Sequence, residues 1–238
     1  TESFNEPGSN RRAILYIGDG LSAAKTTSTD AFQAEVAECR RKQIPINSYA
    51  IGPNTDALFL ASLANQTGGR LLTDGSAITP TVASNLLVDA VLGTVIWPQA
   101  AQVTWPEGVT VYPAPLQPLR TDRDNIVVGK GKAISGASLT VPGRVGDQEV
   151  QLEFKIPESA PNDANSYLPH LVEMASEPGN YLPTLGTQGL GKIRDLVARN
   201  VESLNRLAES AQAVGDPDAA QRISSRASEL DPEDPQAN

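Results

Sequence analysis

Two kinds of segment alternate between residues 11 and 93, and their order limits what this region can fold into. The short apolar run Ala13 to Ile17 leads into glycine and is typical of a buried strand, and PINSYAIG, which also ends in glycine, is expected to form the next strand. A longer segment between them carries Phe32, Val36 and Cys39 at helical spacing. Strands that alternate with helices build a parallel sheet, whose functional residues lie at the carboxyl ends of the strands. The sequence therefore predicts an α/β fold with a doubly wound parallel sheet for residues 1–93.

Start and stop signals divide the same region into helices. The first helix is expected to begin near Ser28 or Thr29. The second, DALFLASLANQ, is capped by one of residues 54–56 and closed by Gly68-Gly69, and the third, TPTVASNLLVDAVLG, has Pro80 in its first turn. The segment RLL between these two helices is expected to form a third short strand.

The stretches ILYIGDGLS and IPINSYAIGPNTDALFLASLANQTGGRLL resemble the second half of a von Willebrand factor type A domain. In that family the fourth strand ends in Asp-Gly, and the fifth reads Ile-Gly-x-x-x-Asp before a helix closed by TGG. The resemblance implies that the first half of the domain is missing, because the chain is a fragment or because another polypeptide supplies that half. The strand Ala13 to Ile17 would then lie centrally in the complete sheet, so its open edge needs a partner strand or a later strand of this chain.

Asp19 is the candidate metal residue. The family's metal site uses Asp-x-Ser-x-Ser, a threonine and the aspartate after the fourth strand, and only the last of these matches a position here, Asp19. A lone carboxylate cannot supply the roughly six oxygens that Mg²⁺ takes, so we expect an incomplete metal site. The isolated chain should therefore hold no cofactor, and Mg²⁺ should bind only if the missing half of the domain is supplied. The alternative for Asp19 is a turn residue that accepts hydrogen bonds from the amides around Gly20 and Ser22. Ser22, Thr26 and Thr27 add hydroxyl oxygens, which are ordinarily loop features.

From residue 94 the apolar pattern changes to period two. Short segments rich in β-branched and aromatic residues are separated by proline and glycine: TVIWP, AQVTWP, VTVYP, NIVVGKG, ISGASLTVPG and QEVQLEFKIP. This pattern predicts an all-β sandwich or small barrel over residues 94–158. The region resembles the β-rich segment that follows the type A domain in inter-alpha-trypsin inhibitor heavy chains. Trp97 and Trp105 are interpreted as core residues rather than a carbohydrate platform.

The remaining residues are expected to be helical. Residues 159–191 combine a short helix in PNDANSYLPHLVEMAS with a Gly/Pro-rich connector, and residues 192–238 form an α-hairpin broken at Gly215-Asp216-Pro217. The hairpin resembles one tetratricopeptide repeat, although Ser224 departs from the pattern. The matching positions are Leu204, Leu207, Ala208, Ala211, Ala220, Ala227 and Pro232. A single repeat leaves apolar surface open, so the stripe from Ile193 to Ala211 should pack on the β region or on another chain.

Composition excludes several classes of partner. The net charge of −9 and the pI near 4.7 argue against a nucleic acid or an anionic membrane surface. No apolar run approaches the roughly 18 residues of a membrane span.

Single cysteine and histidine residues limit the chemistry. Cys39 is the only cysteine, so no internal disulfide can form, and its helical context favours a structural thiol. His170 and Glu173 have metal-ligand spacing but no third ligand, so we interpret His170 as a surface histidine or one with its hydrogen bonds satisfied. The sequence contains neither a nucleophile elbow nor a phosphate loop, and no catalytic triad can be argued from one histidine.

The leading prediction is a non-enzymatic module for protein interaction or adhesion, with a protein partner that includes a chain carrying the first half of the type A domain. An extracellular or cell-envelope location is favoured. The alternative is a structural scaffold of a bacterial envelope or secreted assembly that recruits partners through the helical hairpin. A metal-dependent enzyme ranks third, and it would require an activity that a chelator and Asp19→Ala both abolish.

Overall fold

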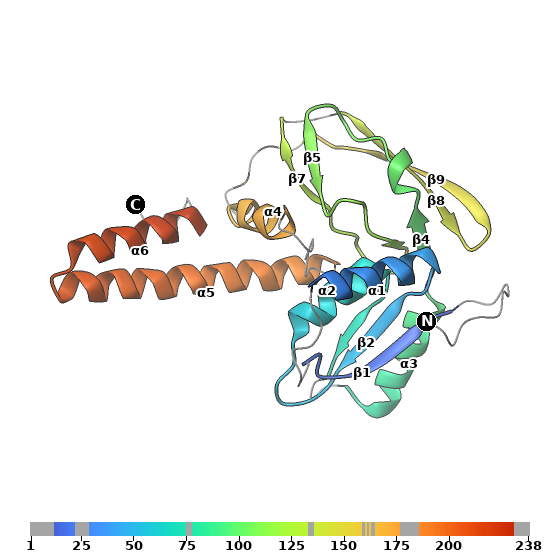
Figure 1. Cartoon of the computed structure of the whole chain (residues 1–238), viewed down its shortest axis with the longest axis horizontal. Helices are drawn as coiled ribbons and strands as arrows, with labels where there is room; N and C mark the ends of the chain where they lie inside the picture. The colour runs from blue at the N-terminus through green and yellow to red at the C-terminus, as the bar shows by residue number, and fades with distance from the viewer. Residues whose placement is uncertain are drawn as a thin grey trace.

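The computed structural model describes residues 12–21, 29–74, 78–132, 136–158, 160, 162, 165–176 and 186–230. Along the chain, a parallel sheet with helices is followed by antiparallel strands and then by helices (Figure 1). The mixed α/β class is therefore confirmed. None of the helices in these ranges is long and apolar enough to cross a membrane.

The first part is a parallel sheet with strand order β1-β2-β3. The connections β1–α1–β2 and β2–α2–β3 run in the same direction across the sheet, so α1 and α2 cover the same face. The helix α3 lies on the other face (Figure 1). The rings of Phe32 and Phe59 join α1 to α2 at a centroid distance of 5.3 Å. The elements are β1 (Ile14–Gly18), α1 (Thr29–Arg41), β2 (Ile46–Ala50), α2 (Ala57–Thr67), β3 (Leu71–Thr73) and α3 (Pro80–Leu92). The alternation predicted for this region is confirmed.

The helix boundaries follow the predicted capping residues. The Asp56 carboxylate accepts a hydrogen bond from the Phe59 amide at 2.9 Å and begins α2. Gly68 ends that helix with φ 75°, a left-handed conformation that costs glycine nothing. Pro80 lies in the first turn of α3, as predicted, and Thr79, which was not predicted as a cap, precedes it as the capping residue. These termini depend on local chemistry, which is why the sequence predicts them.

The second part contains two antiparallel sheets, a four-stranded one with order β6-β4-β8-β9 and a two-stranded one, β5-β7. The strands are β4 (Val95–Pro98), β5 (Val109–Tyr112), β6 (Leu119–Arg120), β7 (Val128–Gly131), β8 (Ser138–Val145) and β9 (Gln148–Lys155). The prediction that AQVTWP is a strand is wrong. A 3-10 helix, η2 (Ala100–Gln102), occupies its start, and only Thr104 pairs, through a single bridge to Thr140. Pro106 then removes a backbone donor.

The third part consists of α4 (Leu168–Ser176), α5 (Gly186–Ala213) and α6 (Pro217–Leu230). The boundary predicted at residue 192 is wrong because α5 begins at Gly186, and Leu190 in the expected connector packs against a hydrophobic core. The glycines of that segment suggested a loop, but tertiary packing outweighs their weak helix propensity. The short helix also starts later than PNDANSYLPHLVEMAS suggested, because Pro169 fits only in the first turn of a helix.

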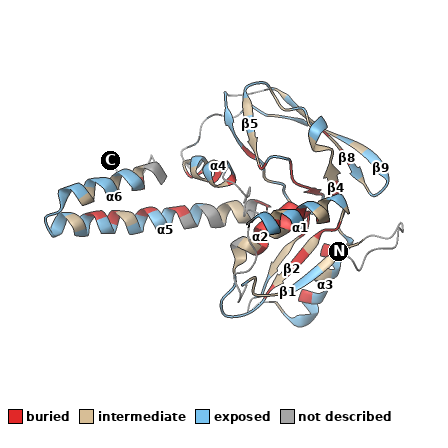
Figure 2. Ribbon diagram, viewed as in Figure 1, coloured by how far each residue is buried: buried red, intermediate tan, exposed pale blue. Residues whose placement is uncertain are grey.

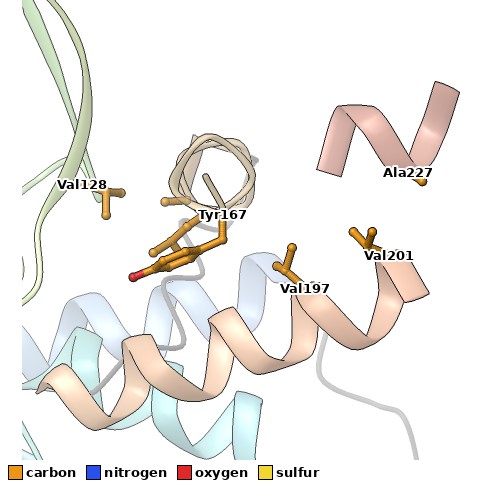
Figure 3. Close-up of a cluster of buried hydrophobic side chains, with 7 residues drawn as sticks. Val128, Tyr167, Val197, Val201 and Ala227 are labelled. Atoms are coloured by element: carbon orange, nitrogen blue, oxygen red, sulfur yellow. The ribbon is translucent and has the colours of Figure 1, made fainter. Parts of the chain in front are cut away.

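One hydrophobic cluster joins the helices to the two-stranded sheet (Figure 3). Val197 and Val201 on α5 lie in it beside α4, β7 and α6. The cluster contains Val128, Tyr167, Leu171, Ala175, Val197, Val201 and Ala227. The α5 stripe therefore reaches the β region through α4, which contacts β7 directly, and the expectation of direct packing on the strands stays a prediction. Leu207, one of the repeat-like positions, is exposed, and Pro232 lies outside the described residues.

Candidate functional site

β1 is the edge strand of the parallel sheet. It pairs with β2 on one side, and no strand among the described residues pairs with its other side. The Ile14 amide donates to the Pro45 carbonyl at 2.9 Å, and the Ile51 amide donates to the Gly18 carbonyl at 3.1 Å. Backbone groups alternate in direction along a strand, so Leu15 and Ile17 direct their N–H and C=O groups away from β2. The open row of backbone groups expected from the sequence is therefore present in the described part of the chain.

Both faces of β1 carry exposed apolar side chains. Leu15 is 44% exposed and Ile17 54% exposed on one face, and Tyr16 is 36% exposed on the other. Figure 2 shows this strand largely in pale blue beside the more buried β2. Edge strands usually carry charges, prolines or bulges that prevent pairing with other chains. The segment ILYIG contains no charge or proline, so β1 has the composition of a central strand at the edge of a sheet.

Carboxylates follow the strands at the same end of the sheet, and each makes a structural contact. The Asp19 Oδ1 atom accepts a hydrogen bond from the Leu21 amide at 3.0 Å, which is the turn role weighed for it from sequence. The Asp19 carbonyl accepts from the Asp56 amide at 2.8 Å, and Asp74 accepts from the Tyr49 hydroxyl at 3.0 Å. Burial and this bond to Asp74 raise the pKa of Tyr49. The rim is thus acidic and held by its own hydrogen bonds.

The described residues contain no group of three or more His, Cys, Asp or Glu side chains that could hold a metal ion. Ser22, Thr26 and Thr27 lie outside the described residues. His170 Nδ1 is 3.6 Å from Glu173 Oε2 on α4, a pair without a third ligand in these ranges. The structure therefore brings neither candidate residue, Asp19 or His170, into a cluster of ligands.

Cys39 and the tryptophans take structural positions. Cys39 is buried in α1, and burial raises the pKa of its thiol, as expected for a structural residue. Trp105 packs against the core formed by Ile96, Leu119 and their neighbours in the four-stranded sheet. Trp97 is half-buried instead, and it lines a cavity of about 470 Å³ that also touches Lys42 and Asp147. The core role predicted for Trp105 is confirmed.

An arginine cluster was not found by sequence reasoning. Arg120 is fully buried and donates to the Gly68 carbonyl at 3.0 Å and to the Ala90 carbonyl at 2.9 Å, at the ends of α2 and α3. Its guanidinium also binds the Asp122 carboxylate at 2.7 and 2.8 Å. In sequence the run RTDRD resembles a solvated loop, so charge patterning gave no signal of burial.

Comparison with known proteins gives weak likenesses. No protein-family model matches the chain, and no curated protein matches it. A von Willebrand factor type A structure from Catenulispora acidiphila is similar, with a TM-score of 0.39 and 14% identity over 93% of this chain and 55% of that chain. The ArnB paralog VWA2 from Sulfolobus acidocaldarius has a TM-score of 0.29 and 12% identity over 94% of this chain and 57% of that chain. The chain spans little more than half the length of either structure, and likenesses at these scores carry no inference about the site.

Proposed function

We propose that this chain is a non-enzymatic protein-interaction module whose partner adds a strand to the outer edge of β1. The observation that carries this proposal is the open backbone row at Leu15 and Ile17, which also bear exposed apolar side chains. Added strands bind through main-chain hydrogen bonds, and alternate side chains supply specificity. An adhesion role and an extracellular or cell-envelope location belong to this proposal.

The partner's chemistry follows from the two faces of β1. Because Leu15 and Ile17 are exposed on one face and Tyr16 on the other, the partner must bring apolar side chains to both faces of its strand. We expect this character of a polypeptide with the first half of a type A domain, because strands buried on both faces of a parallel sheet are apolar. The net charge of −9 and the acidic rim favour basic residues beside that strand. The scaffold alternative has less support because Val197 and Val201 of the hairpin are already buried in a hydrophobic cluster with residues of α4 and α6.

Hydrogen exchange of the β1 amides tests this proposal with a defined probe, a short Val- and Ile-rich peptide with lysines at both ends. In the free chain at high dilution, we expect the Leu15 and Ile17 amides to exchange rapidly and the Tyr16 amide, which points to β2, to exchange slowly. The peptide should slow exchange at Leu15 and Ile17 by about tenfold or more. The same peptide methylated at alternate backbone nitrogens should not, because it cannot pair.

A matched pair of variants separates edge pairing from unspecific apolar binding. Ile17→Lys should abolish the protection, whereas Val88→Lys on α3, also at an exposed apolar position, should leave it unchanged. Full protection of Leu15 and Ile17 in the dilute free chain would contradict the proposal, because the chain would then cover its own edge. Equal loss of the peptide-induced protection in Ile17→Lys and Val88→Lys would also contradict the proposal, because the peptide would then bind without pairing specifically with β1.

We further propose that Asp19 contributes to a Mg²⁺ site only after the partner supplies the remaining ligands. Asp19 offers one carboxylate, and Mg²⁺ takes about six oxygens in near-octahedral geometry. Calorimetric titration of the isolated chain with Mg²⁺ should therefore show no saturable site below about millimolar concentration. Addition of a polypeptide with Asp-x-Ser-x-Ser should create one, and Asp19→Ala should weaken it while the sheet stays folded. A tight site in the chain alone would refute this ligand count.

A further inference from the structure

The loop between β6 and β7 contains Arg123, whose guanidinium nitrogens are buried and have no hydrogen-bond partner among the described residues. The Nε, Nη1 and Nη2 atoms of Arg123 are all buried, and none of them makes a hydrogen bond or ion pair in the described part of the chain. A buried polar group without a hydrogen bond is destabilising, and a buried charge without a partner is more so. Arg123 is therefore the residue whose surroundings most clearly require a ligand.

The neighbouring charges do not neutralise Arg123. Asp122, the carboxylate of this cluster, binds Arg120 at 2.7 Å and lies 3.5 Å from Arg70. Burial, followed by the positive charges of Arg120 and Arg70, lowers the pKa of Arg123 to about 10, and Asp122 opposes this shift. Since this value lies well above neutral pH, Arg123 stays protonated. The cluster thus holds more guanidinium groups than carboxylates, in a chain whose net charge is −9.

We propose that Arg123 binds a small oxyanion, either a phosphate or a carboxylate. A guanidinium presents parallel N–H donors that match two oxygens of such a group, and charge-assisted bonds of this kind are short and strong. A water molecule could accept from Arg123 but would not balance its charge. The oxyanion supplies the acceptors that the Arg123 nitrogens lack among the described residues, and it adds a negative charge to that of Asp122, which already binds Arg120.

The guanidinium nitrogens of Arg123 are closed to solvent, so an oxyanion reaches them only when the loop that carries them moves. Thr121, Asp122 and Asp124 are exposed, so the segment that carries Arg123 lies at the surface. Asn125 closes the loop: its side chain accepts from the Arg120 amide at 2.8 Å and donates to the Arg120 carbonyl at 2.8 Å. None of these residues belongs to β1, so this site is independent of the proposed strand addition.

Thermal unfolding in phosphate, acetate and chloride at equal ionic strength tests the proposal. Phosphate or acetate should raise the unfolding midpoint of the wild-type chain saturably, by about 5 °C at large excess over the dissociation constant. Comparison of the two anions identifies which oxyanion the site prefers. Arg123→Met should lose this shift of the unfolding midpoint. Arg123→Lys keeps the charge but not the parallel N–H donors of the guanidinium, so it should show a smaller shift. Arg194→Met, at an exposed arginine on α5, should retain the full shift.

The chloride arm gives a second, opposite expectation. Without an oxyanion, Arg123→Met should be at least as stable as the wild-type chain, because it removes an unpaired buried charge. A variant that unfolds or loses stability in chloride would overturn the proposal, since Arg123 would then have a partner within the chain. Equal shifts in wild type and Arg123→Met, or no saturable shift in either oxyanion, would overturn it as well.

Discussion

Gly69→Ala is expected to destabilise the α/β unit by more than about 3 kcal/mol, a large part of the stability of an ordinary domain. A Cβ atom at Gly69 would lie 1.8 Å from the Ile46 carbonyl oxygen and 2.4 Å from its carbon. Both are backbone atoms of β2, so no side chain can move aside. The Gly69 amide also donates to the Ala64 carbonyl at 2.7 Å, which holds this residue at the end of α2. Relief of the clash requires separation of α2 from β2.

Urea unfolding followed by circular dichroism measures this effect, and Gly191→Ala is the matched control. Gly191 lies inside α5, and an added Cβ there meets nothing within 4 Å. This control should be neutral or stabilising by about 0.5 to 1 kcal/mol, because alanine favours helix more than glycine does. If Gly69→Ala unfolds at the same urea midpoint as the wild-type chain, the backbone at Gly69 does not lie as close to Ile46 of β2 as described.

The TGG segment shows which features of this fold could be predicted. The sequence indicated that glycine ends α2, and Gly68 does so in the left-handed conformation. The sequence of this segment did not indicate the roles of Thr67 and Gly69, the residues on either side of Gly68. Thr67 Oγ1 accepts a hydrogen bond from the Ile46 amide at 3.1 Å, and Gly69 lies against the same residue. Both contacts join segments distant in sequence, and local pattern does not contain them.

The β region was harder to predict because its pairing is not local. Short strands between prolines, such as β6 (Leu119–Arg120), show no alternation that could identify them. Conversely, AQVTWP has strand-like composition but pairs only through Thr104. The sandwich over residues 94–158 and the tetratricopeptide-like character of the hairpin stay predictions.

The candidate site was predictable in position and less so in character. The end of β1 and the turn role of Asp19 follow from ILYIGDG, because glycine and aspartate there are local signals. The open edge at Leu15 and Ile17 was expected only from the resemblance to half of a type A domain, because an apolar run of this kind is by composition typical of a central strand. Placement at an edge depends on which neighbour is present, a property of the whole sheet.

Arg120→Met is expected to cost about 3 kcal/mol or more, because it removes a wholly buried, charged donor that serves several acceptors at once. The Arg120 side chain is wholly buried, and its removal leaves the Gly68 and Ala90 carbonyls without their donor. These carbonyls lie at the ends of α2 and α3, where the helix dipole favours a positive charge. Asp122 would lose the two hydrogen bonds that it accepts from Arg120. Arg194→Met, at an exposed arginine, should change stability by less than about 0.5 kcal/mol.

The pH dependence of stability gives this variant a second signature. The hydrogen bond from Arg120 lowers the pKa of Asp122 from its ordinary value of 3.8. A carboxyl whose pKa is lower in the folded state stabilises that state above the unfolded pKa, and the contribution is lost as pH falls through the folded pKa. Urea unfolding from neutral pH to below 3.8 should therefore show a smaller loss of stability in Arg120→Met than in the wild-type chain. An equal acid dependence, together with a small change at neutral pH, would mean that Arg120 does not hold Asp122 and the two helix ends together.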